Sequence, residues 1–422
     1  MQKQEDERKE KGPEKMDAVN EEYGYSPDIG DEYKQLIKEG DRRRKRTEKG
    51  RRKRYEQGYR NTLIKLMLTS GGIAYSGLKF LPGNKRMYLR KLKILEREGV
   101  VEILRRNKKE IARLVNFEEN YEKYISHMPI GYYGYYLQHG KPTHKNLGSK
   151  EKNCTRSDRG IKHCEIYEMM YGTGIIKILP EDKTELSSTE SLRSNSICYY
   201  TINEMRECQL FDFHINNEKD KRTIGSRAFG MLISPGGIYA VYNTGKAAMI
   251  WQKSSEGQMA YYMAQIVTKK CEGSRISGAV KNCIIIGYDM NVFENILNNG
   301  LAIYLNTDSG YDNMYAVPYT KDGFKMLLRM TQSEWEETLN EEILPDYERN
   351  KKGSIVYDGI KENVIALNFC TGNISRLKKF ITGVQWVCNT QADRHYEIFC
   401  YSYQEEFIRH VAPNPIEIHV VD

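Results

Sequence analysis

Apolar residues recur at helical spacing in three successive segments of residues 59–117. The first segment, Asn61–Leu68, is ended by Ser70-Gly71-Gly72. The second, Ala74–Phe80, stops at a proline-glycine turn, because proline cannot continue a helix. The third runs over Lys85–Glu98 and is followed by a glycine. The spacing therefore predicts three helices in succession.

The third predicted helix separates apolar from basic residues. Tyr88, Leu92 and Leu95 share one face, as expected for a helix that packs on a core. Basic residues occupy the rest of its surface: Lys85, Arg86, Arg90, Lys91, Lys93 and Arg97.

Two β-favouring segments, Val100–Leu104 and Ile111–Val115, enclose the basic stretch Arg105-Arg106-Asn107-Lys108-Lys109. This pattern predicts a hairpin with a basic tip. Three helices and a two-stranded ribbon predict a winged helix, whose third helix can enter a DNA major groove while the tip reaches phosphates. Two alternatives stay open, because a basic helix is often only a solvated face and winged helices also bind proteins.

Beyond residue 158 the pattern predicts an α/β core. Ala228–Ser234 and Ile238–Asn243 are expected to be strands joined by a Pro-Gly-Gly turn, and Ala247–Trp251 is a third strand candidate. A serine pair is expected to cap a helix that begins at Glu256. The continuously apolar Cys283–Gly287 predicts a strand covered on both sides.

The remaining segments also predict alternating strands and helices. Strands are expected at Ile175–Leu179, Met314–Pro318, Val364–Cys370, 395–403 and 416–421, and helices at Arg159–Gly174, Phe293–Leu297, Gly323–Met330 and Ile374–Ile381. No repeat period appears in the sequence.

The first 54 residues are dense in charge and almost without apolar periodicity, so we expect a disordered arm. Between Asp41 and Arg54, ten Lys and Arg stand against two acids, a local net charge of +8 that equals the +8 of the whole chain. Such a polycation would bind duplex DNA through counterion release. A solubilising tail and an RNA-binding segment are the alternatives. The arm residues expected to contact DNA are Arg42, Arg43, Arg44, Lys45, Arg46, Arg51, Arg52, Lys53 and Arg54.

Chain length and cysteine content limit the classes of protein that the sequence can represent. A chain of 422 residues has room for two or three domains. Nine cysteines without a CxxC pair indicate a reducing cytoplasm. The N-terminus lacks the apolar core of a signal peptide, and no segment is apolar over the ~18–20 residues that a membrane span requires. Cys154, His163 and Cys164 lack a second ligand pair at zinc-finger spacing, so no metal or other cofactor is expected.

The order strand, hairpin, strand, helix and strand behind a winged helix resembles the replication-relaxation family of plasmid and conjugative-element proteins. The resemblance covers roughly residues 59–290 and lies in layout more than in individual residues. Arg159–Ile166 looks like the family's helix after the wing, and Ala228–Glu256 looks like its central sheet and following helix. The resemblance implies a core like that of the PD-(D/E)XK nucleases.

The resemblance also implies an acid on the first core strand and a second acid on the next. Here those places hold Ser226 or Ser234, and Tyr242-Asn243-Thr244-Gly245-Lys246. Cleavage of a phosphodiester with Mg²⁺ needs converging carboxylates to hold the ion. The sequence therefore leans against an enzyme, unless Glu256 or Asp289 completes a displaced set. Each acid also has a structural explanation, the first in a helical turn where the dipole favours it and the second after a strand.

Other chemistries lack their motifs. There is no phosphate-binding loop, nucleophile elbow, HExxH or dinucleotide fingerprint. A relaxase-type nucleophile at Tyr242 or among the tyrosines of 132–136 would lack the histidine cluster that holds the metal in such enzymes, because the eight histidines are widely spaced.

The sequence thus predicts an α+β multidomain protein. Its expected parts are a disordered basic arm (1–54), a winged helix-turn-helix domain (55–118), a helical and Tyr/Gly-rich linker (119–157), an α/β restriction-endonuclease-like core (158–345) and a C-terminal α/β extension (346–422). The expected DNA contacts beyond the arm come from the third helix and the hairpin: Lys85, Arg86, Arg90, Lys91, Lys93, Arg105, Arg106, Lys108 and Lys109.

The predicted function is non-catalytic binding of double-stranded DNA by a cytoplasmic accessory protein of a mobile element, in replication or in DNA relaxation and mobilisation. A relaxase or replication protein as partner, and self-association, are left open, and no membrane partner is expected. The alternatives are a metal-dependent PD-(D/E)XK endonuclease and a winged-helix transcriptional repressor.

Overall fold

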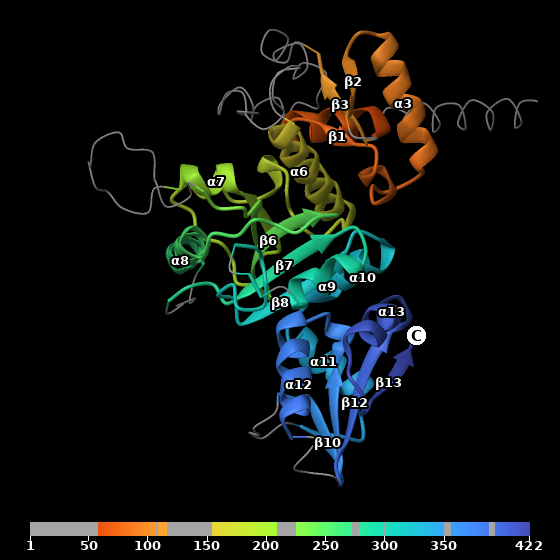
Figure 1. Ribbon diagram of the computed structural model, residues 1–422. Coiled ribbons are helices and arrows are strands. Elements are labelled where there is room, and N and C mark those ends of the chain that lie inside the picture. The colour runs from red at the N-terminus through yellow and green to blue at the C-terminus, as the bar shows by residue number, and fades with distance from the viewer. Residues whose placement is uncertain are drawn as a thin grey trace, which may run out of the picture. The chain divides into compact units, whose positions relative to one another are not determined.

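In the computed structural model, Thr62–Asp422 form one compact unit. The structure describes residues 58–106, 109–115, 154–208, 225–271, 278–298, 300–301, 303–349, 356–387 and 393–422. This described part is an α+β fold with one antiparallel and two mixed β-sheets (Figure 1). None of its helices is both long and apolar enough to cross a membrane. The predictions for the arm and for most of the linker fall outside the described residues.

A three-stranded antiparallel sheet organises residues 62–115. Its strands, in the order β1-β3-β2, are β1 Ile73–Ala74, β2 Val101–Arg106 and β3 Lys109–Leu114. Residues 62–70 are helical, and helix α3 spans Lys85–Arg97, so the first and third predicted helices and the hairpin are confirmed. The apolar face expected for α3 is the face that is buried.

The second predicted helix, Ala74–Phe80, is wrong. Its first residue belongs to β1, which pairs with β3 so that Ala74 lies opposite Ile111. Only a 3-10 turn, Gly77–Lys79, follows. The strand pairing satisfies backbone groups that a helix would have satisfied locally, and the local spacing does not reveal such a distant partner.

Helix α6, Cys154–Gly172, packs against this first sheet. A small buried cluster joins the two: Ala74, Ile111, Ile161 and Cys164. The carboxylate of Glu168 accepts a hydrogen bond from the backbone N–H of Ala74 at 2.5 Å. The first sheet therefore completes its core with a helix from beyond residue 153.

The second sheet has its strands in chain order. They are β4 Cys198–Thr201, β5 Gly230–Ser234, β6 Gly237–Gly245, β7 Asn282–Gly287 and β8 Asn313–Pro318. Strands β4, β5 and β6 pair antiparallel, and β6, β7 and β8 pair parallel. Helices α8 Lys253–Lys270 and α9 Asn291–Asn298 connect the parallel strands. Three further helices belong to this part of the chain: α7 Ile202–Glu207, α10 Lys321–Met330 and α11 Trp335–Ile343.

Three sequence predictions in this region are wrong. Ala247–Trp251 and Ile175–Leu179 are not strands, and each makes only an isolated bridge. The place beside β6 that Ala247–Trp251 would have taken in a meander is occupied by the parallel strand β7. Helix α8 begins at Lys253, not at Glu256, and its N-cap Gln252 makes no capping hydrogen bond through its side chain.

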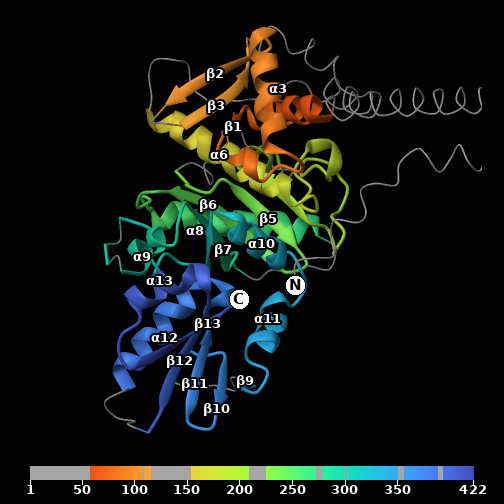
Figure 2. The same cartoon turned by 90° about the vertical axis from the view of Figure 1, so that its right-hand side faces the viewer.

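The third sheet repeats the topology of the second. Its strands, again in chain order, are β9 Glu348–Arg349, β10 Gly359–Lys361, β11 Val364–Asn368, β12 His395–Tyr401 and β13 Ile416–Val421. Strands β9, β10 and β11 pair antiparallel, and β11, β12 and β13 pair parallel. Helices α12 Ile374–Val387 and α13 Ser402–Val411 connect the parallel strands (Figure 2). The sequence pattern does not predict α13, because its first residues continue the alternation of β12.

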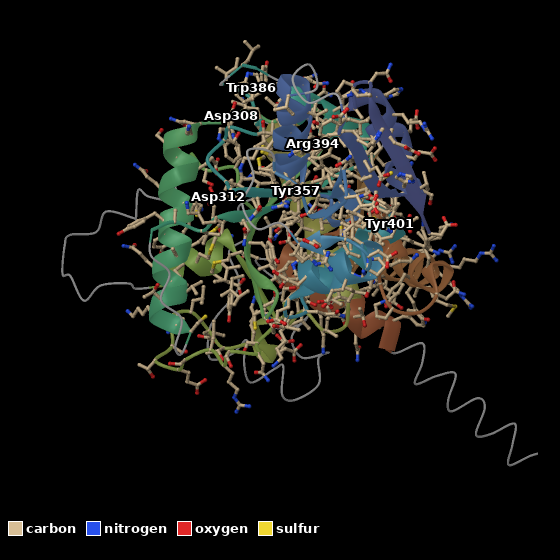
Figure 3. All side chains as sticks on the ribbon, turned by 90° about the horizontal axis from the view of Figure 1, so that it is seen from below. Asp308, Asp312, Tyr357, Trp386, Arg394 and Tyr401 are labelled. Carbon is tan, nitrogen blue, oxygen red and sulfur yellow. The ribbon has the colours of Figure 1, made fainter. Side chains whose placement is uncertain are left out.

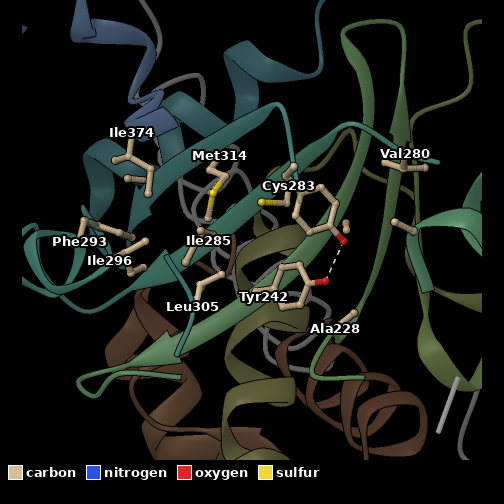
Figure 4. Packing of buried hydrophobic residues seen from close by; sticks show 14 of the residues in the cluster. Ala228, Tyr242, Val280, Cys283, Ile285, Phe293, Ile296, Leu305, Met314 and Ile374 are labelled. Carbon is tan, nitrogen blue, oxygen red and sulfur yellow. Dashed lines mark hydrogen bonds between the residues drawn. The ribbon is translucent and has the colours of Figure 1, made fainter. Parts of the chain in front are cut away.

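The second and third sheets share one hydrophobic core. Tyr242 of β6 lies inside it, fully buried, and is hydrogen-bonded to Tyr311 at 2.8 Å (Figure 4). The edge strand β8 meets the loop before α12, where Ala316 N donates to Gly372 O at 2.8 Å. The two mixed sheets therefore pack together.

Candidate nucleic-acid interface

Helix α3 carries a continuous basic stripe. Its four members are spaced three or four residues apart and are all exposed: Arg86, Arg90, Lys93 and Arg97. Residues at this spacing lie along one face of a helix. The buried residues Tyr88, Leu92 and Leu95 each follow a stripe residue by two positions, which is about 200° around the axis. The stripe therefore points away from the core.

The N-terminus of α3 opens with two cations. Lys85 and Arg86 occupy a first turn that contains no acid, and both are exposed. Asn84 caps this end by accepting a hydrogen bond from Arg86 N at 2.8 Å. Cations in the first turn are unfavourable next to the positive end of the helix dipole, whereas a phosphate there is favourable. An approaching phosphate would relieve this repulsion.

The other expected DNA contact on α3, Lys91, is half-buried and lies off the stripe. Arg97, by contrast, is not among the DNA contacts expected from the sequence. The structure adds it to the stripe, and its spacing of seven residues from Arg90 is a signal that could have identified it.

The cations of the hairpin that the structure describes are paired with carboxylates. Arg105 Nε lies 2.7 Å from Glu110 Oε1, and Arg113 Nε lies 2.6 Å from Glu102 Oε1. The Arg105 side chain is 80% exposed, so this pair contributes little stability and can exchange its carboxylate for a phosphate. Lys108 and the side chain of Arg106 lie outside the described residues, as do the nine arm residues expected to contact DNA.

Lys109 does not extend from the tip of the hairpin as expected. It turns toward the buried Glu165 of α6, with 3.4 Å between Nζ and Oε1. Glu165 also accepts hydrogen bonds from Ser76 Oγ at 2.9 Å and from Tyr288 OH at 2.5 Å, and Asn243 Nδ2 lies 3.4 Å from its second oxygen. This one carboxylate joins the hairpin, the turn after β1 and the ends of β6 and β7.

At the places where the resemblance implies nuclease acids, polar side chains satisfy the backbone. Asn243 Oδ1 accepts from Gly245 N at 2.9 Å, and its Nδ2 donates to Lys162 O at 3.2 Å. Lys162 Nζ in turn donates to Thr244 O at 2.8 Å, and burial lowers the pKa of this lysine. These contacts fasten α6 to the end of β6.

Glu256 is buried and fully engaged. Its carboxylate accepts hydrogen bonds from Ser226 Oγ at 2.8 Å, Arg227 N at 2.5 Å and Tyr242 OH at 2.9 Å. Burial raises the pKa of Glu256, while these hydrogen bonds act in the opposite direction. Burial also raises the pKa of the Tyr242 phenol, so that the phenol is a protonated donor to this carboxylate.

Asp289 is exposed and caps a helix. Its Oδ1 accepts from Val292 N at 3.2 Å in the first turn of α9. Cys164 of α6, one of the residues weighed as a zinc ligand, is buried with its thiol directed at Ser70 O, and burial raises its pKa.

The third sheet has a pocket at the position that corresponds to Asn243. Asn368, at the end of β11, accepts from Cys370 N at 3.1 Å and donates to Leu339 O of α11 at 3.4 Å, which reproduces the contacts of Asn243. A pocket of about 480 Å³ lies beside it. Its wall includes Asp358, which is paired with Arg376, and burial raises the pKa of this acid against the opposing effect of the arginine.

Comparison with known proteins gives no match: no family model, curated protein or solved structure matches this chain. What the protein does must therefore be inferred from its own residues.

Proposed function

We propose that this protein binds double-stranded DNA through α3, with residues 62–115 acting as a winged helix. The basic stripe of α3, formed by Arg86, Arg90, Lys93 and Arg97, carries the proposal. Its residues face away from the core, and within the part of the chain that the structure describes they form no ion pair with an acid. A row of exposed cations on a supported helix suits a helix that lies in the major groove.

The order of elements supports the winged-helix assignment. A helix, the short strand β1, a turn, α3 and the β2–β3 hairpin follow one another, and β1 completes the sheet beside β3. In such an arrangement the third helix is the one expected to read base edges. Because the described hairpin cations are already paired, we assign most of the binding energy to α3 and to the arm, and less to the hairpin.

We further propose that the two mixed sheets form a non-catalytic platform, and that the protein acts in replication or relaxation of a mobile element. The order α6, β4, β5, β6, α8 and β7 supports a core like that of the PD-(D/E)XK nucleases, on which the family proposal rests. The contacts of Glu256 and Asp289 support the non-catalytic form of the proposal, because both carboxylates accept hydrogen bonds from neighbouring protein groups. The endonuclease alternative requires Mg²⁺-dependent nicking of supercoiled plasmid, and the repressor alternative requires a footprint near the protein's own gene.

The test is fluorescence anisotropy of the full-length protein with labelled duplex DNA at several salt concentrations. Replacing Arg86, Arg90 and Lys93 by Ala should weaken binding and reduce the slope of log K against log salt, by about 0.9 for each phosphate that the variant no longer neutralises. The control removes the same type of charge elsewhere, with the exposed Lys253 and Lys379 replaced by Ala. Equal affinity of the α3 variant and the control would contradict the proposal.

A further inference from the structure

The last two strands place three metal-binding side chains on one face of the third sheet. In the parallel pair β12–β13, Glu397 lies beside Glu417, and Phe399 lies beside His419. Side chains two residues apart along a strand point to the same face. The intervening residues of β12 are buried in the hydrophobic core, so these four side chains occupy the opposite face.

The three ligand atoms are close together. His419 Nε2 lies 3.4 Å from Glu397 Oε1 and 3.8 Å from Glu417 Oε1. All three atoms lie within 4.8 Å of one another, and no other group of three or more such side chains gathers in this way among the described residues.

These separations are too long for hydrogen bonds from the imidazole, for which about 2.7–3.2 Å is usual. The Nε2 atom is also buried and makes no hydrogen bond. Two ligand atoms bound to one tetrahedral ion at about 2.0–2.2 Å would lie about 3.3–3.6 Å apart. The 3.4 Å separation falls in this range and the 3.8 Å separation lies slightly above it, so the arrangement is closer to that of a shared ion than to that of direct hydrogen bonds.

We propose that Glu397, Glu417 and His419 bind a divalent transition-metal ion of the Zn²⁺ class. One imidazole nitrogen and two carboxylate oxygens are a donor set that Zn²⁺ accepts, whereas Mg²⁺ and Ca²⁺ favour oxygen alone. Three protein ligands leave a fourth position for water or for an external donor.

Two neighbouring aromatic residues hold the ligands in place. The ring of Phe399 stacks on the His419 imidazole, with centroids 4.8 Å apart and an interplanar angle of 21°. The Tyr347 hydroxyl donates to the second oxygen of Glu397 at 2.6 Å, which leaves Oε1 directed at His419. Such outer contacts orient ligands in metal sites, and their loss commonly weakens binding about 10–100-fold.

The experiment is isothermal titration calorimetry of the full-length protein with ZnCl₂. Wild-type protein should show a site that His419→Ala and Glu417→Gln each lose or weaken at least about tenfold, while Tyr347→Phe weakens it less. Glu417 is 71% exposed, so its replacement by Gln is not expected to disturb folding. The matched control is His410→Ala, which removes an exposed histidine of α13 and keeps every cysteine.

The comparison separates this site from zinc bound elsewhere. Loss in the Glu417 and His419 variants with full retention in the His410 variant supports the site. Identical titrations for wild type and the Glu417 and His419 variants, or no zinc binding by wild type, would overturn it. The readout is metal binding alone, so it does not depend on whether the protein binds DNA.

Discussion

Replacing Glu165 by Ala should destabilise the protein by about 3–5 kcal/mol. The side chain is 0% exposed, and its carboxylate meets the Lys109 ammonium and the hydroxyls of Ser76 and Tyr288. Removing one partner of a buried ion pair costs about 3–5 kcal/mol, because the remaining charge stays desolvated. Because Lys109 is 30% exposed, the cost of leaving its charge unpaired lies near the lower end of this range, at about 3 kcal/mol. Each hydroxyl left without its acceptor adds roughly 1 kcal/mol.

The measurement is urea unfolding, followed by tryptophan fluorescence. Trp251 and Trp335 are buried and report on the core, whereas Trp386 is 80% exposed and contributes little change (Figure 3). A loss of this size should lower the unfolding midpoint by about 1 M or more. The control is Glu405→Ala, which breaks an exposed pair with Arg409 worth only about 0.3–0.5 kcal/mol. An unfolding midpoint for the Glu165 variant equal to that of the control would refute the role of Glu165.

Three further substitutions should change the free energy of unfolding. Gly323→Ala should destabilise by about 1–3 kcal/mol, because a Cβ there would lie 1.8 Å from Pro318 O. Gly257→Ala in α8 has free space and should stabilise by about 0.5–1 kcal/mol, so the two melting temperatures should move in opposite directions. Burial raises the pKa of Glu181 from 4.5 to about 7, so its stabilising contribution is complete below pH 4.5 and is lost as the pH rises toward 7. In urea unfolding, Glu181→Gln should therefore have a free energy of unfolding about 2–3 kcal/mol above that of wild type at pH 8, and nearly the same as wild type at pH 5. An equal difference at both pH values would argue against the raised pKa of Glu181.

The sequence predicted correctly those helices and strands that are determined by neighbouring residues in the chain. The apolar spacing of Tyr88, Leu92 and Leu95 and the glycine at position 99 were sufficient to place α3, and the Pro-Gly-Gly turn was sufficient for the β5–β6 hairpin. The failures concern distant partners. Ala74 enters a strand because β3 lies beside it, and β7 occupies the place beside β6 that the expected strand at Ala247–Trp251 would have taken.

The candidate nucleic-acid interface shows the same dependence on residues that are distant in the sequence. The exposed stripe of α3 could be predicted from helical spacing, and all of its members except Arg97 were expected to contact DNA. The role of Glu165 could not be predicted, because Lys109 lies 56 residues before it in the chain and Tyr288 lies 123 residues after it. The shared topology of the two mixed sheets is likewise hidden from the sequence, since it depends on strand order and not on a repeated motif.

The most direct test of the central proposal is site-specific photocrosslinking from α3 in the full-length protein. A benzophenone amino acid replaces Arg90 on the stripe, and in a control protein it replaces Tyr261, which is 49% exposed on α8. With labelled duplex DNA bound, irradiation should crosslink DNA to position 90 and not to position 261. Binding without a crosslink at position 90, or equal crosslinks at both positions, would contradict DNA recognition by α3.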